Sequence, residues 1–254
     1  MIPKQDGLPV DIRIEKEFLM PVIKSLRQIK KESVDLNDTT HKIFYCQRSK
    51  EELNDTNALK YIEWGEEQGL QNRPTCASRN NWYAIHERKI SQLLYSYILG
   101  ARHLIPLNNL CLADNNLFDI YCDQEKADNL FISLNSTICR LFLENLGREM
   151  TGALAVLKIQ IYELESLLIV NVITNKNVRK QVNRPIKSIF EECGIDPNKP
   201  IREQEPNPLP DRAELDNIIF DELGLTEEER KEVYWAVCEL VKQRLEKARS
   251  LNGK

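Results

Sequence analysis

The sequence predicts a mixed α/β (α+β) fold, in which a mixed-β domain with packed helices is followed by a helical C-terminal tail. Short runs of aromatic and aliphatic residues, separated by turn-forming residues, fill the middle of the chain. Apolar residues then recur at helical spacing in the segments 128–147 and 226–249. A chain of 254 residues is long enough to bury a core without disulfides or metals.

Three elements are predicted before residue 70. They are a short helix around Glu15 to Lys24, a strand within 41–48 and a helix within 57–69. Apolar residues at mixed three- and four-residue spacings predict the first helix, and β-branched and aromatic residues predict the strand. In the second helix, Leu59, Ile62 and Trp64 are expected to face inward. Gly65 and Gly69 are expected to end that helix.

Residues 82–122 are predicted to form a mixed β region. Candidate strands lie at 82–85, 93–99, 103–108 and 116–122. Gly100 and the turn-prone segment 112–116 separate these strands. The basic residues of this region are expected between the strands or at their ends.

The segment 128–147 is predicted to be one long helix. Its apolar residues share one helical face, and Gly147 follows the last of them: Leu130, Leu134, Ile138, Leu141 and Phe142. Residues 157–170 first alternate in polarity and then become continuously apolar, which predicts a strand or a strand leading into a turn.

The remainder of the chain is predicted to be a linker and a helix. The proline-rich, acidic stretch 181–215 is typical of a linker or an irregular surface excursion. Thr226 and Glu229 form a capping-box pattern, after which Val233, Val237, Leu240 and Val241 repeat at helical spacing. The predicted domains are therefore 1–180, the linker 181–215 and the C-terminal helical segment 216–254.

Composition excludes several classes of protein. The longest apolar run, at 167–173, is far shorter than the roughly 20 residues that span a membrane. The N-terminal segment has no apolar core and no small-residue cleavage site of a signal peptide, so we expect a cytoplasmic protein without membrane contact. Seven scattered cysteines, with no Cys-x-x-Cys pair, indicate neither a disulfide framework nor a metal site.

Charge is distributed unevenly along the chain. The whole chain has a formal net charge of −4. Residues 71–110 contain five basic residues and one acidic residue, a local net charge of +4, whereas residues 201–232 contain four basic and eleven acidic residues, a local net charge of −7. Proteins bind the phosphates of nucleic acids through concentrated positive faces. The local excess of positive charge therefore favours nucleic-acid binding more strongly than the negative net charge opposes it.

The sequence lacks the motifs of the common catalytic sites. It contains no Gly-x-Gly, no Gly-Lys-Ser/Thr, no serine-centred elbow and no His-x-x-x-His. Cys111 and His103 are a candidate pair that could act as nucleophile and base. A buried structural cysteine is the commoner reason for such a residue, so we predict no catalytic, cofactor-binding or metal-binding residue.

The segment "RPTCASRNNWYAIHERK", residues 73–89, has two interpretations. In one, Trp82 and Tyr83 anchor a strand in the core while the arginines reach solvent. In the other, arginine reads guanine, Asn80 or Asn81 reads adenine, and Lys89 contacts a phosphate. Composition alone does not separate these interpretations.

Several sequence blocks resemble the C-terminal target-recognition region of adenine-specific DNA methyltransferases of restriction-modification systems. These blocks are "YIEWGEEQG", "RPTCASRNNWYAI", "IPLNNLCLADNNLFDIY" and "NSTICRLFLENLGREMTGALAVLKIQIYELESLLI". The upstream "IEKEFLMPVIKS" and the segment 215–250 are similar to the flanks of that region, so the resemblance covers almost the whole chain. The resemblance implies a recognition domain that binds double-stranded DNA.

The chain departs from the pattern of the family's catalytic half. That half carries a glycine-containing S-adenosylmethionine loop and an Asn-Pro-Pro-Tyr motif, and neither occurs here. In "PNPLP", at 206–210, Leu209 stands where the second proline would be needed. We therefore expect a recognition part, as from a split or truncated gene, which transfers no methyl group alone. S-adenosylmethionine would be bound by a catalytic subunit or domain elsewhere.

The resemblance also implies which side chains meet DNA. The expected DNA-binding residues are Arg73, Arg79, Asn80, Asn81, Trp82, Tyr83, Lys89 and Arg102. The first four would approach base edges or adjacent phosphates, Lys89 and Arg102 would contact the backbone, and Trp82 would serve mainly as a packing anchor. Weaker candidates are Asn108, Asn109, Asn115 and Asn116, because turn asparagines usually serve the backbone.

A second class of function remains open. The amphipathic helix 226–249 would make the chain a non-catalytic protein-binding scaffold if its apolar stripe docked on another protein. The same stripe is our first choice for the contact with a methyltransferase catalytic subunit. In the commoner arrangement, such a helix packs on its own domain. The stripe would then be unavailable both to a second protein and to a catalytic subunit.

Overall fold

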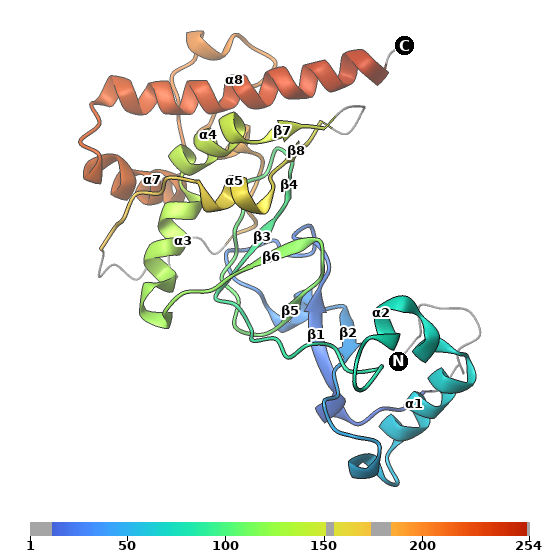
Figure 1. Ribbon diagram of the computed structural model, residues 1–254. Coiled ribbons are helices and arrows are strands. Elements are labelled where there is room, and N and C mark those ends of the chain that lie inside the picture. Colours follow the sequence, from blue (N-terminus) through green and yellow to red (C-terminus); the bar gives the residue numbers. More distant parts are fainter. Residues whose placement is uncertain (1–11, 151–154, 174–183, 253–254) are drawn as a thin grey trace. The chain divides into compact units, whose positions relative to one another are not determined.

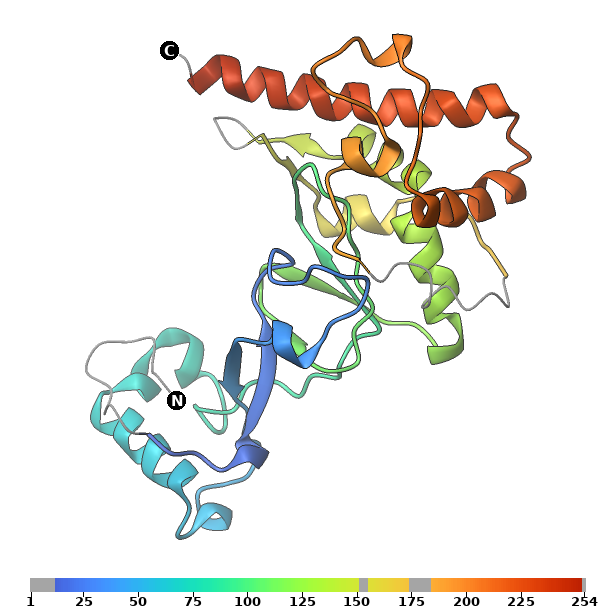
Figure 2. The same ribbon diagram turned by 180° about the vertical axis from the view of Figure 1, so that it is seen from behind.

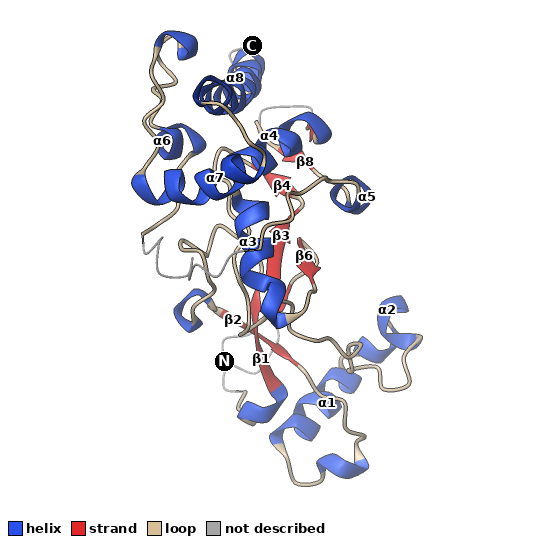
Figure 3. Cartoon of the chain, turned by 90° about the vertical axis from the view of Figure 1, so that its left-hand side faces the viewer, coloured by secondary structure: helices blue, strands red, loops and turns tan. Residues whose placement is uncertain are grey.

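The structure is a computed structural model that describes residues 12–150, 155–173 and 184–252 of the chain. It divides into two compact units, a smaller one of residues 1–22 and 39–89, and a larger one of residues 23–38 and 90–254. Short strands and helices alternate in the described residues, which confirms the predicted mixed α/β class (Figure 3).

In its described residues, the smaller unit contains two paired strands and two helices. They are β1 (Leu19–Ile23), β2 (His41–Phe44), α1 (Asn57–Glu67) and α2 (Pro74–Ala77), with 3-10 turns at Lys16–Phe18, Glu51–Leu53 and Leu70–Asn72. β1 and β2 are antiparallel, with Leu19 opposite Phe44 and Val22 opposite His41. The helix predicted around residues 15–24 is wrong. Pro21 lies in the middle of that segment, where it has no N–H to donate and would clash with the preceding helical turn.

Helix α1 confirms the helix predicted within 57–69. The Thr56 side chain caps it by accepting a hydrogen bond from the Leu59 amide. Ile62 is buried, whereas Leu59 and Trp64 are only partly covered. Gly65 does not end the helix but lies inside it. The chain instead leaves the helix after Glu67 and turns at Gly69, whose φ of 69° suits glycine.

The core of the smaller unit gathers side chains from well-separated positions. Its buried members are Phe18, Cys46, Leu53, Ala58, Ile62 and Tyr83. The strand predicted at 82–85 is wrong, because these residues form a turn and an irregular segment. Their aromatic side chains reflect packing onto α1 rather than pairing in a sheet.

The larger unit contains six strands and six helices among its described residues. They are β3 (Leu93–Ser96), β4 (Ile98–Leu99), β5 (Leu112–Ala113), β6 (Leu117–Ile120), β7 (Arg148–Glu149), β8 (Leu157–Lys158), α3 (Ala127–Asn135), α4 (Thr137–Leu146), α5 (Ile161–Glu165), α6 (Ile189–Cys193), α7 (Pro210–Glu222) and α8 (Glu227–Asn252). β3 pairs with β6 in antiparallel register, and β8 lies between β4 and β7.

Two of the four strands predicted between 82 and 122 are present in the larger unit. The segment 93–99 forms β3 and β4, separated at Tyr97, and 116–122 contains β6. The strand predicted at 103–108 is wrong. That segment is irregular apart from isolated bridges that Leu107 makes with Ser33 and Leu93. The segment 157–170 begins as the strand β8 but continues as the helix α5 instead of a further strand or turn.

The single helix predicted at 128–147 is two helices. α3 ends at Asn135, and the extended residue Ser136 caps α4 by accepting a hydrogen bond from the Cys139 amide at 3.1 Å. A serine competes for backbone donors in this way, so it favours a helix start over a helix interior. Gly147 follows the last residue of α4, as predicted.

The described part of the predicted linker is packed into the core of the larger unit. Ile189, Phe190, Cys193 and Ile195 are all buried in its main hydrophobic cluster. The segment therefore contributes a short helix, α6, and buried apolar side chains to the core, while its prolines lie at exposed or partly covered positions. The predicted domain boundaries at residues 180 and 215 stay a prediction about function, because the two compact units divide the chain at other residues.

Helix α8 is the longest element and packs on its own unit. Figures 1 and 2 show it in red as one continuous helix that runs beside α4. Thr226 and Glu229 make the predicted capping box, with the Thr226 amide donating to Glu229 Oε2 at 2.8 Å. Val237 and Val241 are fully buried in the main cluster, and Val233 packs against it. Leu240 is half-buried and the other three residues of the apolar stripe pack within the chain, so docking of a second protein through this stripe loses its support.

No helix in the described ranges combines the length and the apolar character needed to cross a membrane.

Candidate nucleic-acid interface

The loop that follows α2 is fixed by its own backbone and one arginine. Pro74 takes the first helical position, where a missing N–H costs no hydrogen bond. After α2, the Ala84 amide donates to the Asn81 carbonyl at 2.9 Å, which closes a turn. Arg79 Nη1 donates to the Ala84 carbonyl at 3.0 Å. This bond orients the guanidinium and leaves its other N–H groups for a ligand.

Trp82 holds the loop against α1. Its Nε1 donates to Glu66 Oε1 at 3.1 Å, and a Cβ atom at Gly65 would lie only 2.5 Å from the edge of the indole. Lys50 Nζ lies 2.7 Å from the other oxygen of Glu66. The hydrogen bond from Lys50 is the main cause that lowers the pKa of Glu66, so the acceptor for Trp82 stays ionised. The ring position matches the expected packing anchor.

Tyr83 provides a second anchor for the loop. It is buried, its hydroxyl donates to the Arg48 carbonyl at 2.8 Å, and its ring meets Trp82 edge-on with 5.8 Å between the ring centroids. Burial raises the pKa of the Tyr83 hydroxyl, so it remains a neutral donor. The two aromatic residues thus fix residues 79–84 at two adjacent points.

A surface hollow of about 670 Å³ brings three of the expected readers together. Arg79, Asn80 and Asn81 all line it, with the hydroxyl residues Thr75 and Ser78 beside them. Asn80 is exposed and Asn81 half-buried. Neither amide side chain has a hydrogen-bond partner within the described part of the chain. The hollow therefore offers guanidinium, amide and hydroxyl groups to one ligand.

Sequence reasoning missed several residues of the hollow. Gln47 lines it, although it lies far from the loop in sequence, because its Nε2 donates to the Ile85 carbonyl at 2.7 Å. His86 also contributes, and Glu87 supplies the one carboxylate among the residues that line the hollow. The Ser-Arg-x-x-Trp-Tyr motif signals the loop, but no local pattern signals Gln47.

The remaining basic candidates lie outside this hollow. Arg73 precedes α2 and is exposed, with no side-chain partner among the described residues. Lys89 is exposed at the end of the smaller unit. Arg102 belongs to the larger unit, where it donates to the carbonyls of Ile29, at 2.8 Å, and Leu26. Partial burial lowers the pKa of Arg102, and much of its donor capacity serves the protein backbone.

The weaker asparagine candidates behave as turn residues in part. Asn108 is buried, and its amide donates to the Cys111 carbonyl at 3.0 Å while accepting from the amides of Leu110 and Cys111. Asn109 and Asn115 are exposed, and exposed Asn116 accepts a hydrogen bond from the Tyr97 hydroxyl at 3.2 Å. Asn108 thus has a structural role.

Cys111 and His103 do not form a nucleophile–base pair. Cys111 Sγ donates to Asn108 Oδ1, and burial raises the pKa of its thiol to about 11. His103 Nε2 lies 2.8 Å from the Leu134 carbonyl, and complete burial lowers its pKa well below the ordinary range. Both residues are uncharged parts of the core. In the described ranges, no three histidine, cysteine, aspartate or glutamate residues are grouped so that they could hold a metal ion.

Comparison with known families identifies the chain. The family model described as "Type II methyltransferase M.Eco57I, C-terminal domain" matches residues 22–196, more than half of the sequence. The chain belongs to this family. The match confirms the resemblance found in the sequence blocks, and it includes the hollow-lining loop. No curated protein sequence matches this chain.

The fold of this M.Eco57I-type C-terminal domain also occurs in a restriction enzyme. The crystal structure of the type IIG restriction endonuclease BpuSI matches it with a TM-score of 0.56 and 13% sequence identity. The match covers 92% of this chain and 27% of the BpuSI chain. At this identity the likeness establishes a shared fold. This chain spans about a quarter of the length of the enzyme.

Proposed function

We propose that this M.Eco57I-type C-terminal domain recognises duplex DNA and supplies sequence specificity to an adenine-specific, S-adenosylmethionine-dependent methyltransferase of a restriction-modification system. The observation that carries the proposal is the hollow in which Arg79, Asn80 and Asn81 meet. Family membership and the likeness to part of BpuSI support it. The proposed setting is the cytoplasm, where such a system meets DNA.

The side chains of the hollow suit the edges of bases. Arginine can donate two hydrogen bonds to O6 and N7 of guanine, and an asparagine amide can pair with N6 and N7 of adenine. Asn80 and Asn81 keep their amides without partners in the described structure, while Arg79 is oriented by its bond to the Ala84 carbonyl. Each good bidentate pair discriminates against a wrong base by about 1–3 kcal/mol.

The anchors of the loop give these readers a fixed position. Trp82 and Tyr83 act through packing and hydrogen bonds to α1 and Arg48 in this proposal, rather than by stacking on a base. A rigid loop loses less conformational freedom when it binds, which favours affinity. Arg73 and Lys89 contact phosphates in the proposal. Arg102 contributes to phosphate binding only through the N–H groups that do not already donate to backbone carbonyls.

The catalytic step is assigned to another part of the enzyme. This sequence contains neither a Gly-x-Gly step nor an Asn-Pro-Pro-Tyr motif, so its residues do not match the family's cofactor loop or adenine pocket. The proposed partners are therefore double-stranded DNA and a methyltransferase catalytic subunit or domain. We assign DNA recognition to residues 1–180. No methyl-transfer step is derived for this chain.

Selection from a randomised duplex pool tests the proposal. The purified chain would be used to enrich bound duplexes, and fluorescence anisotropy would then compare the enriched duplex with a scrambled one at several salt concentrations. We expect tighter binding to the enriched duplex, and a linear fall of the logarithm of the binding constant with the logarithm of salt concentration. Failure to enrich any sequence, together with salt-independent binding, would overturn the proposal.

Single substitutions separate base reading from phosphate contact. Asn80→Ala and Asn81→Ala should cost about 1–3 kcal/mol on the enriched duplex and relax one position each, whereas Arg73→Ala should weaken all duplexes alike. Asn54→Ala and Arg13→Ala are matched controls, because both residues are exposed and lie outside the hollow in the same unit. If Asn80→Ala and Asn81→Ala lowered affinity equally for both duplexes, the assignment of readers would be wrong.

A further inference from the structure

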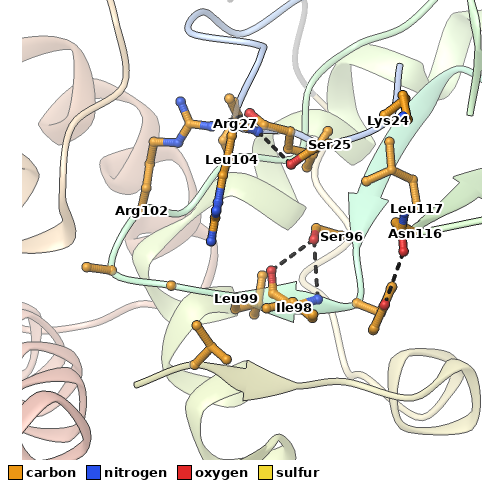
Figure 4. Close-up of a pocket in the computed structure, with 15 residues that line it drawn as sticks. Lys24, Ser25, Arg27, Ser96, Ile98, Leu99, Arg102, Leu104, Asn116 and Leu117 are labelled. Atoms are coloured by element: carbon orange, nitrogen blue, oxygen red, sulfur yellow. Dashed lines mark hydrogen bonds between the residues drawn. The ribbon is translucent and has the colours of Figure 1, made fainter. Parts of the chain in front are cut away.

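The larger unit contains a second pocket with an unusual set of charges. It has a volume of about 370 Å³ and lies between the segment 24–27 and the strands β3, β4 and β6 (Figure 4). Lys24, Arg27 and Arg102 line it, but no aspartate or glutamate does. A pocket without carboxylates stands out in a chain with a net charge of −4. It therefore favours an anionic ligand.

Two of the three cationic side chains that line the pocket are available to bind a ligand. Lys24 is half-buried and Arg27 exposed, and their side chains have no hydrogen-bond or ion-pair partner within the described ranges. Figure 4 shows Arg27 and Arg102 along one side of the pocket, with Ser96 and Ile98 across from them. Lys24 stands apart from the two arginines, on the side of Leu117 and Asn116. A ligand in the pocket would therefore meet positive charge from two directions.

The segment that carries Lys24 and Arg27 is held in shape before any ligand binds. The Arg102 guanidinium donates to the carbonyls of Leu26 and Ile29. Gln28 Oε1 accepts from the amide of Lys24 at 3.1 Å. These hydrogen bonds thus hold the backbone from which the Lys24 and Arg27 side chains extend. Such preorganisation reduces the entropy lost on binding.

The other walls supply donors and apolar surface. Asn116 lines the pocket and accepts a hydrogen bond from the Tyr97 hydroxyl at 3.2 Å through its Oδ1, so its amide nitrogen remains available as a donor. Ile98, Leu104 and Leu117 provide apolar lining. Cationic and amide donors beside apolar surface suit the phosphate and sugar of a nucleotide, and the volume accommodates one such unit.

We infer that this pocket binds the phosphate and sugar of one nucleotide unit, through Lys24 and Arg27. The inference stands on the chemistry of the larger unit alone and does not require that Arg79, Asn80 or Asn81 reads a base. Two sources share this ligand chemistry: a free nucleoside monophosphate and the backbone of DNA. Arg102 acts as a positioning residue, because it holds the segment that presents the other two cations.

Binding by a charge-deleted variant tests the inference. Lys24→Ala/Arg27→Ala removes both free cations without removing a hydrogen bond of the described structure. Lys30→Ala/Arg249→Ala is the matched control, since it deletes the same charge at exposed residues of the same unit that do not line the pocket. Circular dichroism and thermal unfolding of both double variants should match the parent protein, and Arg27→Lys should retain most of the binding.

The first arm uses deoxyadenosine 5′-monophosphate, with deoxyadenosine as the uncharged comparison, in a ligand-observed NMR titration. The second uses a random-sequence duplex in anisotropy measurements across a salt series. Nucleotide binding that weakens at least fivefold in the pocket variant alone supports a free-nucleotide site. A contact with the DNA backbone is supported if no nucleotide binds but the pocket variant loses duplex affinity at least fivefold. The slope of the logarithm of the binding constant against the logarithm of salt concentration should then decrease by the contribution of about two phosphate contacts.

The control decides the remaining case. If the pocket variant and Lys30→Ala/Arg249→Ala bind both probes alike, the inference is overturned. This outcome is independent of the proposed base reading, because the random duplex contains no single recognition sequence. Conversely, loss of selectivity for an enriched duplex in Asn80→Ala would leave the pocket result unchanged.

Discussion

At the scale of single residues, the contact between Gly65 and Trp82 fixes the candidate interface. A methyl group at Gly65 would overlap the indole edge, and the indole is also held by its bond to Glu66. We expect Gly65→Ala to destabilise the smaller unit by about 1–3 kcal/mol, as overpacking usually does, although alanine favours a helix by about 1 kcal/mol. Urea unfolding measures the change, and an increase in stability would contradict this account of the contact.

Glu32 is a buried carboxyl group in the larger unit. Only 6% of it is exposed, and its Oε1 has no partner in the described structure. It lines a small cavity with Arg184 and Arg212. Burial, and secondarily Asp211, raises its pKa from 4.5 to about 8, against the opposing effect of the two arginines. The group therefore binds a proton in the folded state at neutral pH.

This pKa predicts a pH dependence of stability. Between pH 4.5 and about 8 the folded state binds more protons at Glu32 than the unfolded state, so the free energy of unfolding falls as pH rises. Glu32→Gln mimics the protonated form. We expect the decrease in the free energy of unfolding with rising pH to be smaller by ~2–4 kcal/mol in this variant than in the parent protein. Urea unfolding at pH 5, 6.5 and 8 checks the slope, with exposed Glu125→Gln as control. Parallel profiles for parent and Glu32→Gln would refute it.

At the scale of elements, one carboxylate joins three helices of the larger unit. Asp216 on α7 accepts hydrogen bonds from the Thr137 amide at 2.7 Å and the Thr137 hydroxyl at 2.6 Å, at the start of α4. It also accepts from the Tyr234 hydroxyl of α8 at 3.2 Å. Arg212, one turn away on α7, is buried beside it. The contact therefore satisfies a helix N-terminus and balances a buried charge.

Replacement of this carboxylate should be costly. We expect Asp216→Ala to lower the free energy of unfolding by about 3–5 kcal/mol, because it leaves Arg212 without one of its partners and leaves three buried donors without their acceptor. Asp216→Asn should lose less, since its amide oxygen can still accept. Glu222→Ala, at an exposed position of the same helix, serves as control. Equal thermal stability of Asp216→Ala and the control would contradict the role of Asp216.

At the scale of the whole molecule, the two units have separate cores. The buried cluster of the smaller unit shares no residue with the clusters of the larger unit among the described residues. We expect Ile62→Ala, a cavity in the smaller unit, to raise amide hydrogen exchange in α1 and residues 82–85 but not in α4 or α8. Ile132→Ala should do the reverse. Each truncation should lower the free energy of unfolding of its own unit by about 2–5 kcal/mol.

Mass spectrometry of exchanged peptides resolves the two responses. If either substitution raised exchange equally in both units, the chain would unfold as one cooperative body. The outcome also guides the binding experiments, because independent units allow the hollow and the cationic pocket to be altered one at a time. Variants of each site should then leave the protection of the other unit unchanged.

The sequence by itself determined the features that depend on neighbouring residues. Thr226 and Glu229 lie three residues apart, so their capping box and the start of α8 follow from the sequence. The Ser-Arg-x-x-Trp-Tyr motif, with the blocks around it, was sufficient to indicate the family. Local charge pointed to residues 71–110, where the loop of the hollow lies. The mixed α/β class also followed from local patterns.

Only the tertiary structure decided which distant residues meet. Gln47 reaches Ile85, and Trp82 rests on Gly65, through contacts that no periodicity encodes. The burial of Ile189 and Phe190 in a proline-rich segment likewise depends on the surfaces that the rest of the larger unit presents. Local hydrogen bonds and side-chain spacing specify an element over a few residues. Long-range packing depends on the path of the whole chain, and it placed Arg79, Asn80 and Asn81 in one hollow and Arg102 beside a different pocket.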